Sequence, residues 1–227
     1  MKAVVFDTGP IISLTMNNLL WVIPELKSRF AGEFLIAEAV KIELVDKPLA
    51  TKKFKFEAIQ VRQLVQAGIL TVVPDSETRD LSMKLLDKAA TFYKAQGQFI
   101  NVVHYGEMSS VAAALIRGAD ALVIDERTTR ELIEAPRHLA HHLHSKLHTH
   151  IESNELAMRE FQSQVKGIRV VRSSELAARA YELGLLNKYL LQRDMRKQVL
   201  DAILWGLKLN GCAITSEEID ALIHIEA

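Results

Sequence analysis

The sequence predicts an α/β protein, a three-layer α/β/α sandwich with a mainly parallel central sheet. The first observation is a set of five short apolar runs rich in β-branched residues: Ala3–Phe6, Phe34–Ala37, Leu70–Val73, Ala121–Ile124 and Ile168–Val171. Each run is continuous rather than alternating, which is typical of strands buried on both faces. The second observation is that helical patterns separate the runs, and this alternation favours the sandwich.

The helices are expected from their apolar faces and from the residues that end them. Between Met108 and Leu115 the apolar residues fall on one helical face, and Gly118 ends that helix. Residues 74–98 are expected to form a long, mixed helical stretch. Residues 127–165 are expected to form a helical excursion, with a helical hairpin as one alternative, and its part from about 134 to 165 is interpreted as an insertion.

The C-terminal segment 173–226 is also expected to be helical, with the tail proper at about 184–227. Within it Thr215 and Glu218 have the spacing of a capping box, in which each side chain bonds the backbone of the other. The chain has neither an internal repeat nor a linker rich in Ser, Gly or Pro. We therefore expect residues 1–227 to form a single domain with a helical insertion and a helical tail.

Composition gives no indication of a charged partner, because Lys plus Arg and Asp plus Glu number 28 each among the 227 residues. A polyanion would have to be held by a local basic patch or by metal ions. Cys212 is the single cysteine, which fits a reducing compartment. No apolar stretch reaches the roughly 18 residues of a membrane span, and the N-terminus does not resemble a signal peptide. We expect a cytoplasmic protein without a membrane partner.

Carboxylates stand where the predicted strands end, which is the edge at which a parallel sheet binds its ligands. Asp7 comes directly after the first strand and Asp125 directly after the fourth. Glu43 lies in a helical turn after the second strand, and Glu107 lies in the first turn of the helix before the fourth. We expect these four side chains to gather in one cleft.

Four carboxylates in one cleft repel each other at neutral pH, so either their pKa values rise or a cation lies among them. Carboxylate oxygens are hard ligands that suit Mg²⁺ or Mn²⁺. An ion held in this way can activate water and stabilise the charge of an in-line displacement at phosphorus. The acids therefore indicate metal-dependent hydrolysis.

Each acid also has a structural interpretation. Asp7 or Thr8 would cap the helix that follows the first strand, and Asp125 would cap the helix that follows the fourth. The helix dipole favours Glu107 at a helix N-terminus without any function, and Glu43 would lie in solvent. The functional interpretation depends on all four acids occurring together.

Four segments of the chain resemble the PIN-domain family of metal-dependent ribonucleases, above all its standalone prokaryotic and archaeal members related to VapC-type toxins. They are VVFDTGPIISL, IAEAVKIEL, YGEMSSVAAALIRGADALVIDERTTREL and, less closely, LDAILWGLKLNGCAITSEEIDALI. The resemblance implies an α/β/α fold, Mg²⁺ or Mn²⁺ in an acidic cleft, and hydrolysis of RNA. Matched residue by residue, the family's acids fall on Asp7, Glu43, Glu107 and Asp125, and Val40 keeps the V-x-x-E spacing to Glu43.

Further residues near these acids receive supporting roles. Glu126 stands at a position that is often acidic in the family, and it is expected to help hold the metal through an outer-shell water. Thr8 or Ser13 is expected to orient a ligand through its hydroxyl. Arg127 and Arg130, just beyond the fourth acid, either contact RNA phosphates or lie in solvent.

Two further acids are weighed against the site, and one further basic run is a candidate RNA contact. Glu38 is the second choice to Glu43, and Asp120 precedes the fourth strand, so it would lie at the opposite edge of the sheet. The run KKFKF at 52–56 is a further basic patch. Its two phenylalanines either stack on bases or pack against a helix or loop.

The insertion is a departure from the shorter relatives, and it holds six of the eight histidines: His138, His141, His142, His144, His148 and His150. His144 and His148 have zinc-ligand spacing, but neither a Cys nor an acid completes a metal motif. The simpler interpretation is a solvated or oligomer-facing helix. A pH-dependent contact and altered access to the cleft are further alternatives.

The first function hypothesis is a Mg²⁺- or Mn²⁺-dependent endoribonuclease, either a toxin of a toxin–antitoxin pair or an enzyme of RNA maturation or quality control. A toxin implies an antitoxin that blocks the cleft, and the family implies a homodimer. The alternative is a catalytically silent RNA-binding or scaffold protein with the same fold. A haloacid-dehalogenase-type phosphatase would need an Asp where Gly9 stands, and the chain has no GxxxxGK loop.

Overall fold

The computed structural model describes residues 2–190 and 195–226, and a parallel five-stranded sheet lies at its centre. The strand order is β3-β2-β1-β6-β8, and every neighbouring pair runs parallel. The strands are β1 (Lys2–Phe6), β2 (Gly32–Ala37), β3 (Thr71–Val73), β6 (Ala121–Val123) and β8 (Arg169–Val171). All five predicted strands are confirmed, and so is the predicted α/β/α class.

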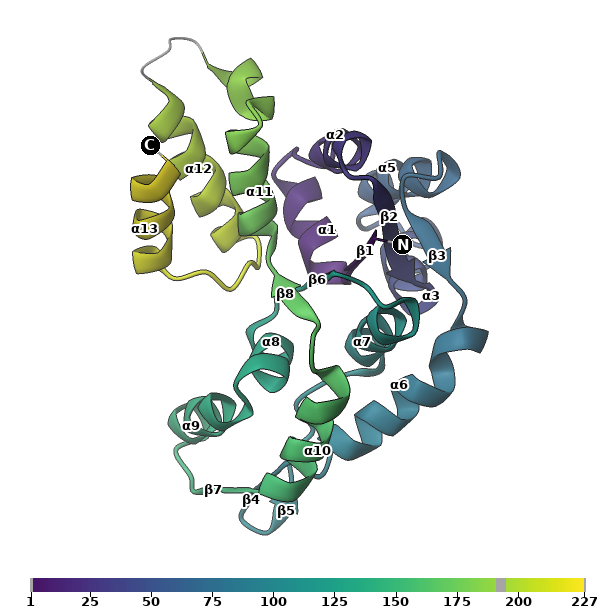
Figure 1. Ribbon diagram of the computed structural model, residues 1–227, viewed down its shortest axis with the longest axis vertical. Helices are drawn as coiled ribbons and strands as arrows, with labels where there is room; N and C mark the ends of the chain where they lie inside the picture. The colour runs from purple at the N-terminus through teal and green to yellow at the C-terminus, as the bar shows by residue number, and fades with distance from the viewer. Residues whose placement is uncertain (1, 191–194, 227) are drawn as a thin grey trace.

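Helices cover both faces of this sheet (Figure 1). On one face α7 (Tyr105–Arg117) contacts β1, β2 and β6, and α6 (Asp75–Ala89) packs against α7. The other face carries α1 (Thr8–Met16), α2 (Val22–Arg29) and α11 (Ser173–Glu182), and α11 contacts both α1 and α2. The strands are therefore covered from both sides, which explains why their sequences are apolar without alternation.

The predicted apolar face of α7 is confirmed by its burial. Met108, Val111 and Ala112 are fully buried against the sheet. The helix ends at Gly118, whose φ of +56° is left-handed, a conformation that glycine adopts without the steric cost of a Cβ. This helix matters for the site because its first turn carries Glu107.

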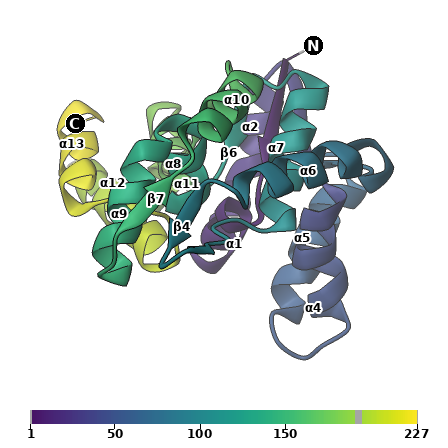
Figure 2. The same ribbon diagram turned by 90° about the horizontal axis from the view of Figure 1, so that it is seen from below.

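The connection after β2 is a series of short helical turns rather than one helix. It comprises α3 (Glu38–Lys41), the π-helical turn η1 (Ile42–Asp46), α4 (Lys47–Leu49) and α5 (Lys55–Gln66). Figure 2 shows α4 and α5 extending away from the rest of the molecule. A π-helical turn is rare and often marks a functional position, and here it carries Glu43.

A second sheet of three antiparallel strands was not predicted. Its order is β5-β4-β7, with β4 at Tyr93–Ala95, β5 at Gln98–Phe99 and β7 at Ile151–Ser153. The helical prediction for residues 74–98 is therefore wrong beyond Ala89, where α6 ends. The strands of this sheet lack the continuous apolar runs of the central sheet, and β4 pairs with β7, which lies far away in the sequence.

The excursion over 127–165 is a set of helices interrupted by β7, rather than a helical hairpin alone. Its helices are α8 (Arg127–Glu134), α9 (Pro136–Leu147) and α10 (Glu155–Val165). Tyr93 of β4 is fully buried, and its hydroxyl donates a 2.7 Å hydrogen bond to the backbone oxygen of Pro136. The second sheet thus attaches the insertion to the segment that follows α6.

The C-terminal tail is helical where it is described. It contains the 3₁₀ turn η2 (Leu185–Tyr189), α12 (Arg196–Leu209) and α13 (Ser216–Glu226), whereas residues 191–194 and 227 of the predicted tail lie outside the described residues. The capping box is confirmed, with Thr215 N donating to Glu218 at 2.8 Å and Glu218 N donating to the Thr215 hydroxyl at 3.2 Å. None of the helices described is long and apolar enough to cross a membrane.

Candidate active site

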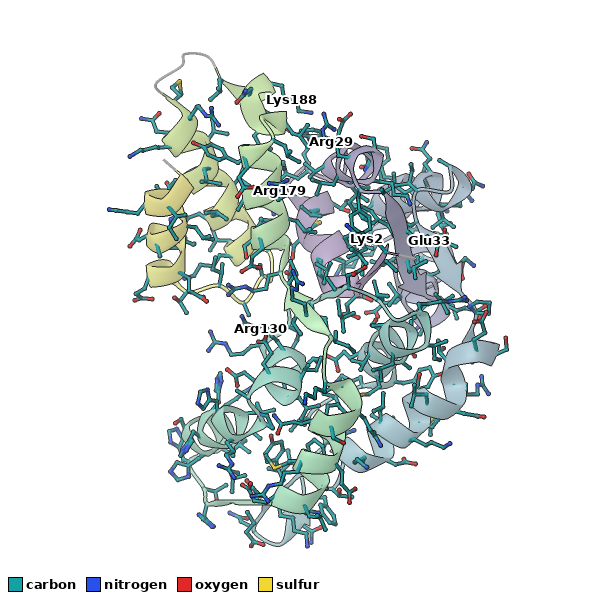
Figure 3. The ribbon with its side chains drawn as sticks, viewed as in Figure 1. Lys2, Arg29, Glu33, Arg130, Arg179 and Lys188 are labelled. Carbon is teal, nitrogen blue, oxygen red and sulfur yellow. The ribbon has the colours of Figure 1, made fainter. Side chains whose placement is uncertain are left out.

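A cavity of about 920 Å³ opens at the carboxyl edge of the sheet, between the first turns of α1, α6 and α7 and the turn after β2. Lys2 and Glu33 mark the opposite, amino-terminal ends of β1 and β2 (Figure 3). The acids that line the cavity are Asp7, Glu38, Glu43, Asp75, Glu107 and Glu126. Three of the four acids predicted to share a cleft therefore lie in one cavity.

Asp7 is the most buried of these acids, with 6% of its surface exposed. It follows β1 directly, and its Oδ1 accepts a 2.8 Å hydrogen bond from the Ser110 hydroxyl on α7. Burial raises the pKa of the Asp7 carboxyl to about 6; the Ser110 hydroxyl opposes the rise, and the charge of Glu43 adds to it. The site therefore disfavours an uncompensated negative charge on Asp7.

Glu43 is exposed at the cavity wall, in the π-helical turn after β2. Its Oε2 accepts a 3.0 Å hydrogen bond from the hydroxyl of Thr8 at the start of α1. Thr8 lines the cavity, and this hydroxyl orients the carboxylate of Glu43. The turn after β2 and the start of α1 are thus joined across the site.

Glu107 and Glu126 each bond the backbone at the start of a helix. Glu107 Oε2 accepts from the N–H of His104 at 2.6 Å, and Glu126 Oε2 accepts from the N–H of Thr129 at 2.6 Å. The pKa of Glu107 is raised, mainly by burial and further by the charges of Asp7 and Glu126, while the His104 N–H opposes the rise. Both residues act as caps and also line the cavity, so the cap does not remove either carboxylate from it.

Asp125 does not line the cavity. It is 1% exposed, and its two carboxylate oxygens accept hydrogen bonds from the backbone N–H and the hydroxyl of Ser173, at 2.7 Å each. A Cβ added at Gly9 would lie 3.4 Å from the Cβ of Asp125, so glycine lets α1 approach this side chain. Direct ligation of an ion by Asp125 would require its bonds to Ser173 to open.

Three other predicted residues lie away from the cavity lining. Ser13 is buried, and its hydroxyl donates a 3.4 Å hydrogen bond to the backbone oxygen of Asn210, at the end of α12. Arg130 lies on the side of α8 that faces the C-terminal helices (Figure 3), where its Nη2 donates to the Ala213 oxygen at 3.4 Å. Arg127 begins α8 without lining the cavity. None of the three lines the cavity in this structure.

Glu38 and Asp120, the two acids that were not assigned to the site, have structural contacts. Glu38 Oε2 accepts a 2.7 Å hydrogen bond from the backbone N–H of Asp75 and so joins α3 to α6. Asp120 Oδ2 accepts a 2.9 Å hydrogen bond from the N–H of Ala3, at the amino-terminal edge of the sheet, as its position before β6 predicts.

Lys47 and four further polar or charged residues that line the cavity were not predicted; the four are Asp75, Arg79, His104 and Tyr105. Asp75 accepts hydrogen bonds from the Tyr105 hydroxyl and from Arg79 Nε, and both lower its pKa. Asp75 follows β3 after a single proline, so examining the end of the third strand as well would have found it. The other three had no comparable signal in the sequence.

The chemistry of the acids fits a divalent ion, because several carboxylates line one cavity and burial there raises the pKa values of Asp7 and Glu107. Among residues 2–190 and 195–226, no three His, Cys, Asp or Glu side chains are arranged to hold one ion together. Mg²⁺ does not require such a cage, since it commonly takes one or two carboxylates and completes its shell with water and phosphate oxygens.

The histidine-rich segment forms a separate hollow of about 390 Å³, lined by His141, His144 and His150 beside Arg137 and Glu155. The predicted helix ends before His148, which has a left-handed φ of +51°. His144 and His148 therefore do not share a helical face. Nδ1 of His144 lies 2.7 Å from the Thr149 oxygen.

Comparison with known families gives one match, a family model described as a PIN domain, over residues 3–136. Comparison with curated proteins and with solved structures gives no match. The matched segment covers more than half of the chain and runs from β1 to the start of α9. PIN domains are typically nucleases, and they generally use divalent metal ions. The chain therefore belongs to the PIN-domain family.

Proposed function

We propose that this protein is a Mg²⁺- or Mn²⁺-dependent endoribonuclease that hydrolyses RNA phosphodiester bonds in the acidic cavity. The observation that carries the proposal is the buried carboxylate of Asp7, whose pKa is raised to about 6 in a cavity shared with Glu43, Glu107 and Glu126. A divalent ion, when bound, supplies a Lewis acid and lowers the pKa of a coordinated water.

The proposed metal residues are Asp7, Glu43, Glu107 and Glu126. Each carboxylate is oriented by a hydrogen bond: Asp7 by Ser110, Glu43 by Thr8, and the other two by helix N-terminal N–H groups. Such outer-shell bonds fix the direction of a ligand and tune its basicity. We assign Asp125 a positioning role behind Asp7, because its oxygens are both bonded to Ser173.

Cationic side chains at the cavity would hold the RNA backbone. Lys47 and Arg79 line the cavity together with the acids. Arg79 is paired with Asp75 at 2.7 Å, so its guanidinium is held near the wall. We therefore propose Lys47 and Arg79, rather than Arg127 and Arg130, as the phosphate contacts nearest the reacting bond.

The toxin role, an antitoxin partner and a homodimer stay predictions. Growth arrest on expression of the chain, relieved by Asp7→Asn, would support the toxin role. Light scattering of the purified chain would establish whether it is a dimer.

The test of the nuclease is cleavage of labelled single-stranded RNA with Mn²⁺, with Mg²⁺ and with EDTA. We expect cleavage that requires the metal and is lost in Asp7→Asn. Glu33→Gln, which removes an acid at the opposite edge of the sheet, is the control and should cleave as the parent does. Cleavage that survives Asp7→Asn would contradict the proposed site.

A further inference from the structure

Another hollow, of about 260 Å³ and distinct from the one lined by histidines, adjoins the acidic cavity. Its lining is mostly apolar and includes Met16, Pro48, Phe54 and Val61. Ile12 and Glu43 line both hollows, so the apolar hollow begins at the wall that carries one of the proposed metal residues. A group bound there would lie next to the reacting bond.

Phe54 is the aromatic residue of this lining, and its placement is unusual. Its side chain is half exposed, at 48%, although it is large and apolar. Its φ of +58° is left-handed, a conformation that is an outlier for a bulky residue and that glycine would adopt with less strain. Strained residues concentrate at ligand sites, so the ring has a role other than filling a core.

The lysines of the segment that carries Phe54 favour a nucleic acid over a protein segment, whereas the charged residues that line the hollow itself are the acids Glu43 and Glu57, so the hollow suits an uncharged base rather than a phosphate. Lys53 Nζ lies 4.7 Å from the centroid of the Phe54 ring. Lys47, Lys52 and Lys55 are exposed on the same projecting segment, and Lys47 also lines the acidic cavity. An aromatic ring among lysines is how single-stranded nucleic acids are bound, with bases stacked on the ring and phosphates on the cations.

We propose that the hollow receives one unpaired nucleobase of the RNA, stacked on Phe54, beside the phosphodiester bond that is cleaved. This inference rests on the proposed nuclease function and makes it more specific. The substrate is single-stranded at the cut, because a base within a duplex cannot leave its stack without losing its pair. A base in the hollow also leaves its adjoining phosphate near the acidic cavity, which Lys47 and Glu43 both line.

The test combines a change in the protein with a change in the RNA. The substrate is a single-stranded oligoribonucleotide with one mapped cut, and each nucleotide near the cut is replaced in turn by an abasic residue. The proteins are the parent, Phe54→Gly and Phe54→Tyr. Glycine suits the left-handed φ, so Phe54→Gly removes the ring without straining the fold, and tyrosine keeps a ring.

We expect one abasic position to lower kcat/KM of the parent by about 5- to 150-fold, the range of one base–aromatic stack. On the intact RNA, kcat/KM of Phe54→Gly should be lower than that of the parent by a similar factor. The abasic residue at that position should not lower kcat/KM of Phe54→Gly any further. Phe54→Tyr should behave as the parent. Phe56→Ala is the matched control, because Phe56 is 69% exposed and lies outside the hollow lining. Phe56→Ala should lose as much kcat/KM as the parent does when the abasic residue is introduced.

Metal-dependent cleavage with the same abasic losses in the parent and in Phe54→Gly would overturn the base site and leave the nuclease standing. The hollow would then belong to an apolar protein segment. If no RNA is cleaved, the nuclease proposal fails, and binding of the same oligonucleotides in EDTA decides the base site alone. The base site is supported if the abasic residue weakens binding to the parent but not to Phe54→Gly. It is overturned if the abasic residue leaves binding to the parent unchanged, or if no RNA binds.

Discussion

Both carboxylate oxygens of Asp125 accept hydrogen bonds from Ser173, one from the backbone N–H and one from the hydroxyl, at 2.7 Å each. The backbone oxygen of Asp125 also accepts a 3.0 Å hydrogen bond from the N–H of Ala213. Asp125 lies inside the segment 3–136 that matches the PIN family, whereas its two partners lie beyond it. One residue therefore ties the family fold to the C-terminal helices.

We expect Asp125→Asn to destabilise the protein. The amide replaces one accepting oxygen by a donor that faces Ser173, and a buried hydrogen bond to a charged group contributes about 1.5–3 kcal/mol. The free energy of unfolding should fall by roughly that amount, measured by urea denaturation without metal. Ser173→Ala should also lose stability, because it removes the bond from the hydroxyl and keeps only the one from the backbone N–H. A fully stable Asp125→Asn would contradict the positioning role.

Asp7→Asn should have the opposite effect on the metal-free protein at pH 7.5. Burial raises the pKa of Asp7 to about 6 from 3.8, so the folded state holds this proton more tightly than the unfolded chain. Ionisation of Asp7 therefore lowers the free energy of unfolding as pH rises from about 4 to 6, by up to about 3 kcal/mol in total. Asparagine does not carry this cost.

The measurement is the difference in unfolding free energy between parent and Asp7→Asn as a function of pH. The variant should be the more stable protein above pH 6, and the difference should shrink as pH falls through 4 and disappear only well below 3.8, where Asp7 is protonated in both the folded and the unfolded state. Glu33→Gln at the opposite edge serves as the control. A difference that does not change between pH 4 and 7.5 would contradict the raised pKa of Asp7.

Ser110→Ala should weaken metal binding most at mildly acid pH. The Ser110 hydroxyl lowers the pKa of Asp7, so without it the carboxyl keeps its proton to higher pH and the metal must compete with that proton. The apparent affinity for Mn²⁺ is measured by calorimetry between pH 5.5 and 8. We expect the variant to need a higher pH than the parent to reach the same affinity.

Ser109→Ala is the matched control, since Ser109 is also fully buried and its hydroxyl donates to the Tyr105 oxygen within α7. Its pH profile should equal that of the parent. Equal shifts in both variants would mean that α7 has been disturbed in general, and would remove the specific role assigned to Ser110.

The parallel sheet could be predicted because its strands are buried on both faces and carry that burial in their own sequences. The second sheet could not. Tyr93 and Ile151 belong to strands of three residues each, paired across a long stretch of chain. Pairing of this kind depends on contacts made only after folding, and these strands lack the continuous apolar run that marks the equally short β3, β6 and β8.

The cavity could be predicted from the rule that acids at strand ends share an edge, which brought Asp7, Glu43 and Glu107 together. The rule could not separate Asp125 from Glu126. Successive residues of an extended segment point to opposite sides, so one of the pair faces the cavity and the other faces Ser173. The sequence alone does not say which, because Ser173 lies 48 positions away from Asp125.

Glu107→Gln should separate the two roles of Glu107. Glutamine can still accept the hydrogen bond from the His104 N–H, so the cap of α7 is kept, while the charge that a metal needs is lost. RNA cleavage should fall by at least about 100-fold, the upper range for loss of even an outer-shell partner, with no loss in thermal stability. Glu107→Ala should lose the activity and about 1 kcal/mol of stability as well, because it removes the cap. Full activity in Glu107→Gln would mean that the residue serves only to cap the helix.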